Sequence, residues 1–181
     1  LQNEKSIVSV EDKIEYIRKL TQAGHTHIEA TSFVRPDRIP QMADGDEVFR
    51  QIKELGLLEK AEFPCLVPNL KGMQKAVEVG CREVAFFTAT SETFNKKNIN
   101  ASIEESFERL KPVAELAKSS EIRIRAYIST VFGCPYEGKT SISTLENVVQ
   151  RLQEMGAYEV SLGDTIGVAA PDQVQRILQT L

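Results

Sequence analysis

Apolar and polar positions along this chain follow two spacings in turn, which predict alternating helices and strands. Ile14, Ile17 and Leu20 recur at helical spacing, and the segment HIEATSF that follows Gly24 has strand character. The same alternation predicts further helices at 45–55, 70–79, 102–118, 144–155 and from Pro171 onward, and further strands at 62–67, 83–88, 122–130 and 158–162. The chain is therefore expected to contain five strands and six helices.

Short strands joined by long helices are typical of parallel strands with right-handed crossovers, so the predicted class is α/β. Long polar segments follow the strands, at 33–44, 89–101 and 131–143, as expected for the catalytic face of a (β/α)8 TIM barrel. Such a barrel needs about 250 residues. Five strands in 181 residues therefore predict one partial barrel domain over 1–181, incomplete at both ends and holding about strands 2 to 6. A doubly wound sheet would fit this length, but no GxGxxG or Walker sequence is present.

The stretch YEVSLGDTIGV, residues 158–168, is the most informative segment. It runs a short alternating strand into a Gly-Asp-Thr turn and then toward a helix, so Asp164 is predicted just beyond the carboxyl end of a strand. Gly163 and Gly167 allow a tight turn and a close approach to a ligand. The alternative interpretation is that Asp164 only caps a helix.

Strand alternation also predicts which side chains face the barrel interior. It places Glu29 on the inner face of its strand, Arg125 and Tyr127 on the inner face of another, and Glu159 and Ser161 on a third. An isolated charge inside a protein is costly, so Arg125 is expected to pair with Glu29 or Glu159.

The composition and charge of the chain argue against some classes of partner. The chain is 41% hydrophobic and 27% charged with a formal net charge of -4, which argues against nucleic acid as the main partner. No apolar run of membrane-spanning length and no targeting segment is present, so no membrane partner is expected and a cytoplasmic or mitochondrial-matrix location is predicted. The three widely spaced cysteines, Cys65, Cys81 and Cys134, are expected to be free thiols.

Six stretches together resemble one enzyme family. They are LQNEK at Leu1, IEATSFVRPDRIPQM at Ile28, VPNLKG at Val67, KKNINASIEES at Lys96, FGCPYEGK at Phe132 and SLGDTIGV at Ser161. Because these stretches occur in the family's order along the chain, the chain resembles the 3-hydroxy-3-methylglutaryl-CoA (HMG-CoA) lyases. The resemblance implies a TIM-barrel lyase that splits HMG-CoA into acetoacetate and acetyl-CoA in leucine degradation, with Mg²⁺ or Mn²⁺ as cofactor and a homodimeric assembly.

The same resemblance suggests roles for individual residues. Asp164 and Glu29 match acidic residues that line the family's active site, and Asp164 is the preferred member of the proton-transfer machinery. For Glu29 a structural ion pair is an equal alternative. Substrate contacts are expected from Ser161, Thr165 and Arg125, and coenzyme A contacts from Lys96, Lys97, Asn98 and Lys139, although lysines on exposed loops are often only solvated.

The family's metal ligands lie outside the motifs found here, before LQNE and after SLGDTIG. We therefore expect no metal-ligating residue in this chain and no activity from residues 1–181 alone. His25 and His27 imitate a two-histidine ligand pair, but they lie at the entry of a strand, which is the stability face of a barrel. Cys134 has no matching histidine or aspartate and is expected to be a structural or redox-sensitive thiol.

Two other functions remain open from the sequence. One is a related acyl-CoA condensing enzyme of the isopropylmalate or homocitrate synthase type, which shares the Gly-Asp-Thr turn; the GCPYEGK motif argues against it. The other is a noncatalytic fragment that binds a partner through its open sheet edges, because exposed edges favour association.

Overall fold

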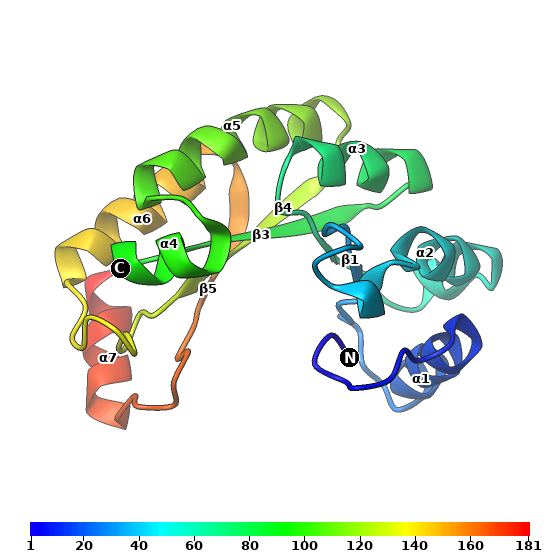
Figure 1. Ribbon diagram of the computed structural model, residues 1–181, viewed down its shortest axis with the longest axis horizontal. Helices are drawn as coiled ribbons and strands as arrows, with labels where there is room; N and C mark the ends of the chain where they lie inside the picture. Colours follow the sequence, from blue (N-terminus) through cyan, green and yellow to red (C-terminus); the bar gives the residue numbers. More distant parts are fainter. The chain divides into compact units, whose positions relative to one another are not determined.

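The computed structural model describes residues 1–181, and its five strands pair in chain order, β1-β2-β3-β4-β5, with helices between them (Figure 1). The strands are β1 (Thr31–Ser32), β2 (Cys65–Leu66), β3 (Glu83–Ala89), β4 (Arg123–Ser129) and β5 (Ala157–Leu162). The α-helices are α1 (Val10–Gln22), α2 (Gly45–Glu54), α3 (Leu70–Val79), α4 (Glu92–Ile99), α5 (Ile103–Ser119), α6 (Ile142–Glu154) and α7 (Pro171–Thr180). Short 3-10 helices are η1 (Pro40–Met42) and η2 (Leu57–Glu59). β1 with β2, β2 with β3, and β4 with β5 pair in parallel, which confirms the predicted α/β class.

Packing divides the chain into two compact units. Unit 1 comprises 1–85 and 116–123, and unit 2 comprises 86–115 and 124–181. The expectation of a single partial domain over 1–181 stays a prediction. None of the helices is both long and apolar enough to cross a membrane.

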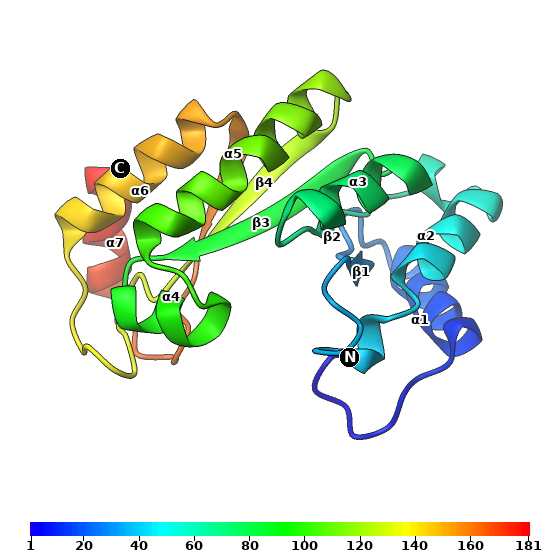
Figure 2. The same ribbon diagram turned by 45° about the horizontal axis from the view of Figure 1, so that its top comes forward.

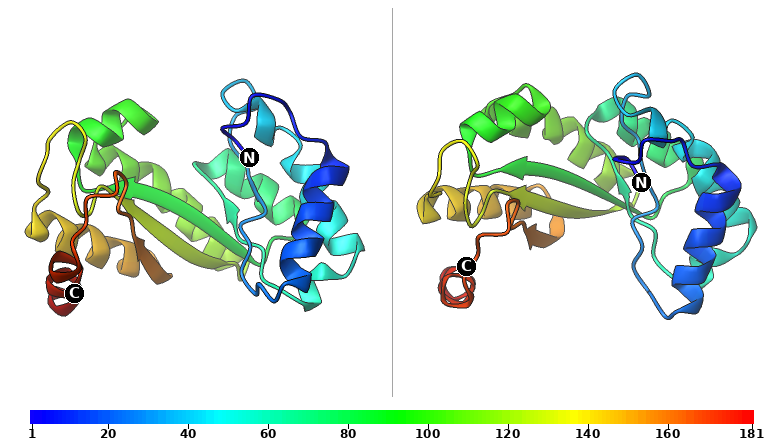
Figure 3. Two further views of the ribbon diagram at one scale, coloured as in Figure 1. Left: turned by 90° about the horizontal axis from the view of Figure 1, so that it is seen from below. Right: turned by 60° about the horizontal axis from the view of Figure 1, so that its bottom comes forward.

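In unit 1, α1 and α2 lie against each other (Figure 3). The buried ammonium of Lys13 on α1 lies 2.6 Å from the carboxylate of Asp44, the residue that precedes α2, and also donates to the Gln41 carbonyl. A cation this deeply buried is tolerated because it has both partners. The core of the unit consists of fully buried apolar side chains, among them Val48, Phe49, Ile52, Val67, Met73 and Val84.

The first two strands are shorter than the sequence predicts. Only Thr31–Ser32 of HIEATSF and Cys65–Leu66 of 62–67 are regular strand. Outside these strands, the Ile28 N–H donates to the Glu62 carbonyl at 3.0 Å, and His27 and Glu62 form an isolated bridge. Pro64 explains part of this interruption, because proline has no N–H to donate to the ladder.

In unit 2, the side chains of β4 alternate as predicted. Ile124, Ala126 and Ile128 are buried, whereas Arg125 and Tyr127, on the opposite face, are partly exposed. Figure 2 shows α5 and α6 beside the strands of this unit. The apolar core contains Phe86, Phe107, Ile128, Leu145 and Leu152.

Four predicted helices, α2, α3, α5 and α6, begin and end within two residues of their expected bounds. The prediction of a loop over 89–101 is wrong, because this segment contains α4. The Ser91 side chain caps the helix by accepting from the Phe94 N–H at 3.1 Å, and Asn100 ends it in the left-handed region at φ 51°. Asn95 is the one buried residue of α4, so the helix carries no apolar periodicity to reveal it.

Candidate active site beyond the strand ends

Asp164 lies where it was expected, in the turn that follows β5, with its carboxylate exposed. Its two oxygens accept the backbone N–H groups of Val168 and Ala169, each at 3.0 Å. The carboxylate therefore shapes its own loop, as the capping alternative proposed. Each carboxylate oxygen has a second lone-pair direction, so these bonds also hold Asp164 in one orientation with acceptor capacity left for a substrate hydroxyl.

Gly163 fixes the start of this turn. Its N–H donates to the Ile128 carbonyl at 2.8 Å, and a Cβ at this position would lie 2.9 Å from that same oxygen. The backbones of β4 and the turn approach each other so closely that no side chain fits between them. Glycine at 163 is required for this contact rather than for an unusual φ.

Thr165 turns its hydroxyl back toward the end of β4. Its Oγ1 accepts the backbone N–H of Thr130 at 2.7 Å. Ser161, on β5, is partly buried and pairs in register with Tyr127. The structure thus brings Ser161, Asp164 and Thr165 onto one short segment of unit 2, but their predicted contacts with substrate stay predictions.

Arg125 pairs with Glu159, one of its two expected partners, which confirms the predicted ion pair. The guanidinium contacts Glu159 Oε1 at 2.6 Å and donates to the Tyr127 hydroxyl at 2.8 Å. Partial burial of Arg125 opposes its charged form, but the hydrogen bond to Glu159 and the interactions with Tyr127, Glu159 and Tyr158 together raise the pKa of Arg125 above its ordinary value. This side chain therefore has a structural partner, and its role in substrate binding stays a prediction.

Glu29 belongs to unit 1, where its side chain is exposed while its neighbour Ile28 is buried. This is the alternation that the sequence predicts for the segment. Glu29 lines a cavity of about 150 Å³ together with Lys13, Thr31 and apolar residues of α1. Its catalytic role stays a prediction.

The proposed coenzyme A residues lie on two neighbouring segments of unit 2. Lys96, Lys97 and Asn98 are exposed on α4, not on a loop as predicted, and Lys139 is exposed in the segment after β4. The Lys97 ammonium lies 3.8 Å from the centre of the Tyr136 ring. Sequence reasoning missed Tyr136, although the FGCPYEGK motif contains it.

The same motif is fixed to α4 by further contacts. The Glu137 carboxylate accepts the Thr93 N–H at 2.7 Å, at the first turn of the helix. The buried thiol of Cys134 lies 3.0 Å from the Ser91 hydroxyl, which fits the expected structural role. Cys65 and Cys81 in unit 1 are also buried and free, as predicted, and burial above all raises the pKa of the Cys65 thiol.

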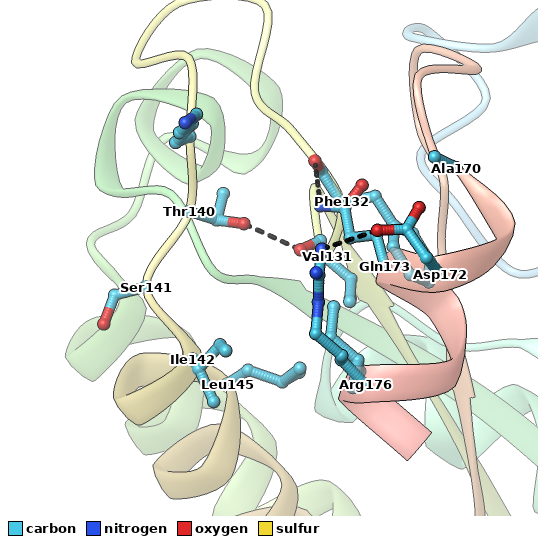
Figure 4. Close-up of a pocket in the computed structure, with 12 residues that line it drawn as sticks. Val131, Phe132, Thr140, Ser141, Ile142, Leu145, Ala170, Asp172, Gln173 and Arg176 are labelled. Atoms are coloured by element: carbon cyan, nitrogen blue, oxygen red, sulfur yellow. Dashed lines mark hydrogen bonds and ion pairs between the residues drawn. The ribbon is translucent and has the colours of Figure 1, made fainter. Parts of the chain in front are cut away.

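A cavity of about 380 Å³ opens between the loop after β4 and the helices α6 and α7 (Figure 4). Its lining includes the apolar side chains of Leu145 and Ile177, together with Lys139 and the Arg176–Asp172 ion pair. The Gln173 side chain donates to the Phe132 carbonyl at one wall. This hollow lies on the helix side of unit 2 and does not contain Asp164.

A metal site would need several ligating side chains close together. No group of three or more His, Cys, Asp or Glu side chains is placed to hold a metal ion. His25 and His27 are exposed at the entry of their segment. The residues present do not form a complete ligand set.

Comparison with known proteins gives one consistent result. The HMGL-like family model matches residues 1–181. The mitochondrial hydroxymethylglutaryl-CoA lyase of Macaca fascicularis is 49% identical over 181 residues, which are 100% of this chain and 55% of the relative. The hydroxymethylglutaryl-CoA lyase of Pseudomonas mevalonii is 45% identical over 179 residues, covering 99% of this chain and 58% of the relative. The chain thus spans little more than half the length of these curated relatives.

Solved structures agree. The hydroxymethylglutaryl-CoA lyase of Pseudomonas aeruginosa superimposes with a TM-score of 0.92 at 46% identity, over 98% of this chain and 58% of that one. An HMG-CoA lyase from Acinetobacter baumannii, in complex with coenzyme A and 3-methylmalate, gives a TM-score of 0.92 at 34% identity, over 99% of this chain and 58% of that one. The prediction of an incomplete barrel is confirmed, because the chain matches part of each of these lyases.

Proposed function

We propose, since the chain belongs to the HMGL-like family, that the complete protein is a carbon–carbon lyase that cleaves HMG-CoA to acetoacetate and acetyl-CoA. The observation that carries the proposal is the match along the whole chain, with 49% identity to a curated lyase and the Gly-Asp-Thr turn held at the end of β5. The complex of one relative with coenzyme A supports an acyl-CoA as the substrate class.

The cleavage is a retro-Claisen step. A base removes the proton of the tertiary hydroxyl, the bond between the hydroxyl-bearing carbon and the methylene next to the thioester breaks, and acetyl-CoA leaves as its enolate. Asp164 is the proposed member of this proton transfer, because its carboxylate is exposed, oriented by two N–H bonds and still able to accept. Ser161 and Thr165 would bind the acyl group beside it. A catalytic role for Glu29 is proposed from the family resemblance alone.

Lys96, Lys97, Asn98 and Lys139 are proposed to bind the phosphates of coenzyme A. All four are exposed in unit 2, on α4 and on the segment after β4. A phosphate attracts ammonium groups as point charges, and the exposed position makes each single contact weak. The binding energy would therefore come from the group of residues rather than from one of them.

The complete enzyme is proposed to use Mg²⁺ or Mn²⁺, which would act as a Lewis acid toward the substrate oxygens. Its ligands are expected outside residues 1–181, and the isolated segment is therefore expected to be inactive. A homodimeric assembly and a cytoplasmic or mitochondrial-matrix location are proposed from the family.

The test is acetoacetate release from HMG-CoA by the full-length protein, with and without a chelator. Metal-dependent release supports the lyase, and Asp164→Asn should lower kcat by at least about 100-fold if Asp164 acts on the proton. Asp172→Asn, which alters another exposed carboxylate of unit 2, is the matched control and should retain activity.

Condensation of acetyl-CoA with a 2-keto acid, without release from HMG-CoA, would reject the lyase in favour of a condensing enzyme. Absence of both reactions together with capture of a protein partner would favour the noncatalytic alternative.

A further inference from the structure

Thr130, the residue that follows β4, has an unusual backbone conformation. Its φ is +62°, in the left-handed region, and its side chain is fully buried. A β-branched side chain at positive φ crowds its own backbone, so this conformation persists only where neighbouring groups hold it.

The neighbour that holds it is Thr90, which follows β3. The Thr90 hydroxyl donates to the Thr130 carbonyl at 2.9 Å, and the Thr90 N–H donates to the Ser129 carbonyl at 3.1 Å. The two threonine hydroxyls lie 3.1 Å apart, and the Thr130 hydroxyl donates to the Ser129 carbonyl at 2.6 Å. Thr90 is itself buried. All of these contacts lie within unit 2.

The backbone of Thr130 and Val131 in turn forms hydrogen bonds with the Gly-Asp-Thr turn on both sides of Asp164. The Thr130 N–H donates to Thr165 Oγ1 at 2.7 Å, and the next N–H, of Val131, donates to the Gly163 carbonyl at 3.2 Å. The Asp164 carboxylate bonds only within its own loop. The position of Asp164 relative to β4 therefore depends on the backbone at 130–131 and on the Gly163 contact with Ile128.

We propose that Thr130 is a positioning residue, held in its left-handed conformation by Thr90, which fixes the turn that carries Asp164 and Thr165. The proposal rests on the proposed lyase function. Because Thr165 Oγ1 accepts the Thr130 N–H with a lone pair, its own hydroxyl hydrogen stays available to a substrate oxygen. Thr130 thus orients the Thr165 hydroxyl and positions the Asp164 carboxylate, without touching the substrate.

The primary test compares Thr90→Val with Thr90→Ser in the full-length protein. Valine keeps the branched shape and loses the hydroxyl, whereas serine keeps the hydroxyl. Thr90→Val should lower kcat about tenfold and leave KM within about twofold, because misplacing the turn affects the reacting geometry more than binding. Thr90→Ser should restore kcat to within about twofold of the unmodified protein.

Amide hydrogen exchange of the segment 163–170, followed by mass spectrometry without substrate, provides a readout that does not require activity. Thr90→Val should speed this exchange, although Thr90 touches neither Asp164 nor Thr165. If Thr90→Val and Thr90→Ser have equal kcat, or if exchange over 163–170 is unchanged, the proposal is overturned, even if both variants melt at a lower temperature.

A second pair keeps the proposal testable if Thr90→Val does not fold. Thr165 is exposed, so Thr165→Val should fold while removing the acceptor of the Thr130 N–H. Exchange over 163–170 should be faster in Thr165→Val and unchanged in Thr165→Ser; equal exchange in the two variants overturns the proposal. An unmodified protein that releases no acetoacetate would reject the proposed function, and the exchange comparison would then decide by itself whether Thr130 fixes the turn.

Discussion

The Lys97 ammonium lies 3.8 Å above the centre of the Tyr136 ring, which joins α4 to the FGCPYEGK motif within unit 2. Tyr136 is half exposed and also lies 6.4 Å, centre to centre, from the Phe94 ring. An ammonium over an aromatic face is attracted by the ring and loses side-chain freedom, yet its outer side remains hydrated. Lys97 is therefore already oriented before an anionic ligand arrives.

Removing the Tyr136 ring should weaken binding of the acyl-CoA substrate. An exposed cation–π contact contributes about 0.5–1 kcal/mol, so Tyr136→Leu should raise KM for HMG-CoA about two- to fivefold at unchanged kcat. Tyr136→Phe keeps the ring and should retain the original KM. Steady-state kinetics of the full-length protein checks this, and an equal KM in both variants would show that Lys97 needs no ring to bind.

The contact between Glu137 of the FGCPYEGK motif and Thr93 of α4 should depend on pH. Hydrogen bonds from the side chain and the N–H of Thr93 hold the pKa of Glu137 below its ordinary value. A lowered pKa in the folded state means that the stabilisation is fully present above the ordinary value of 4.5 and is lost as pH falls through the folded value. The contact should therefore weaken only below about pH 4.5.

The NMR chemical shift of the Thr93 amide, followed from pH 6 downward to about pH 3, measures this loss. Glu137→Gln keeps an acceptor oxygen without a titrating charge and is the matched control. Its Thr93 resonance should not titrate, and an identical titration in both proteins would assign the change to another group.

The Arg125–Glu159 pair should contribute measurably to stability. Arg125 is 23% exposed and Glu159 47%, so solvent screens the pair in part, and the coupling energy should be about 1 kcal/mol, at the upper end for surface pairs. A double-mutant cycle with Arg125→Met and Glu159→Gln, read from denaturant unfolding, gives this value. The Asp172–Arg176 pair on α7, 68% exposed on both sides, is the control and should couple by less than about 0.5 kcal/mol.

Particular residues show how far the sequence could predict this structure. The alternation of Arg125 and Tyr127 with buried Ile124 and Ala126 was enough to predict an inward-facing arginine that needs a carboxylate. It could not choose between Glu29 and Glu159, because that choice depends on the pairing register in which Arg125 lies opposite Glu159. Hydrophobic periodicity indicates the face of the strand on which a residue lies, but not the residue with which it pairs.

Two further features of the structure, the helix α4 and the conformation of Thr130, are not predicted by any apolar pattern in the sequence. The helix α4 is polar and buries only Asn95, so its start depends on a single capping serine that also fits a loop. The left-handed conformation of Thr130 runs against the preference of a β-branched residue, and contacts with Thr90, 40 residues away in the chain, maintain it. Local preference cannot predict a conformation that distant contacts impose.

Replacing Gly163 by alanine should lower both the stability of the protein and its rate of reaction. Replacing a glycine away from the Asp164 turn should lower the stability alone. A Cβ at 163 would lie 2.9 Å from the Ile128 carbonyl oxygen, a backbone atom that cannot move aside without shifting β4 or the turn. Gly163→Ala should therefore cost about 2 kcal/mol of unfolding free energy and lower kcat at least about tenfold, because the displaced turn carries Asp164.

Gly156 provides the matched control, since it follows α6 at φ +93° and has open space where a Cβ would be. Gly156→Ala should cost about 1 kcal/mol for the left-handed backbone and leave kcat unchanged. Thermal unfolding and acetoacetate release of the two full-length variants separate the effects. A Gly163→Ala protein that is destabilised but fully active would mean that the reaction tolerates movement of the Asp164 turn, and Asp164 would then lose its proposed part in the proton transfer.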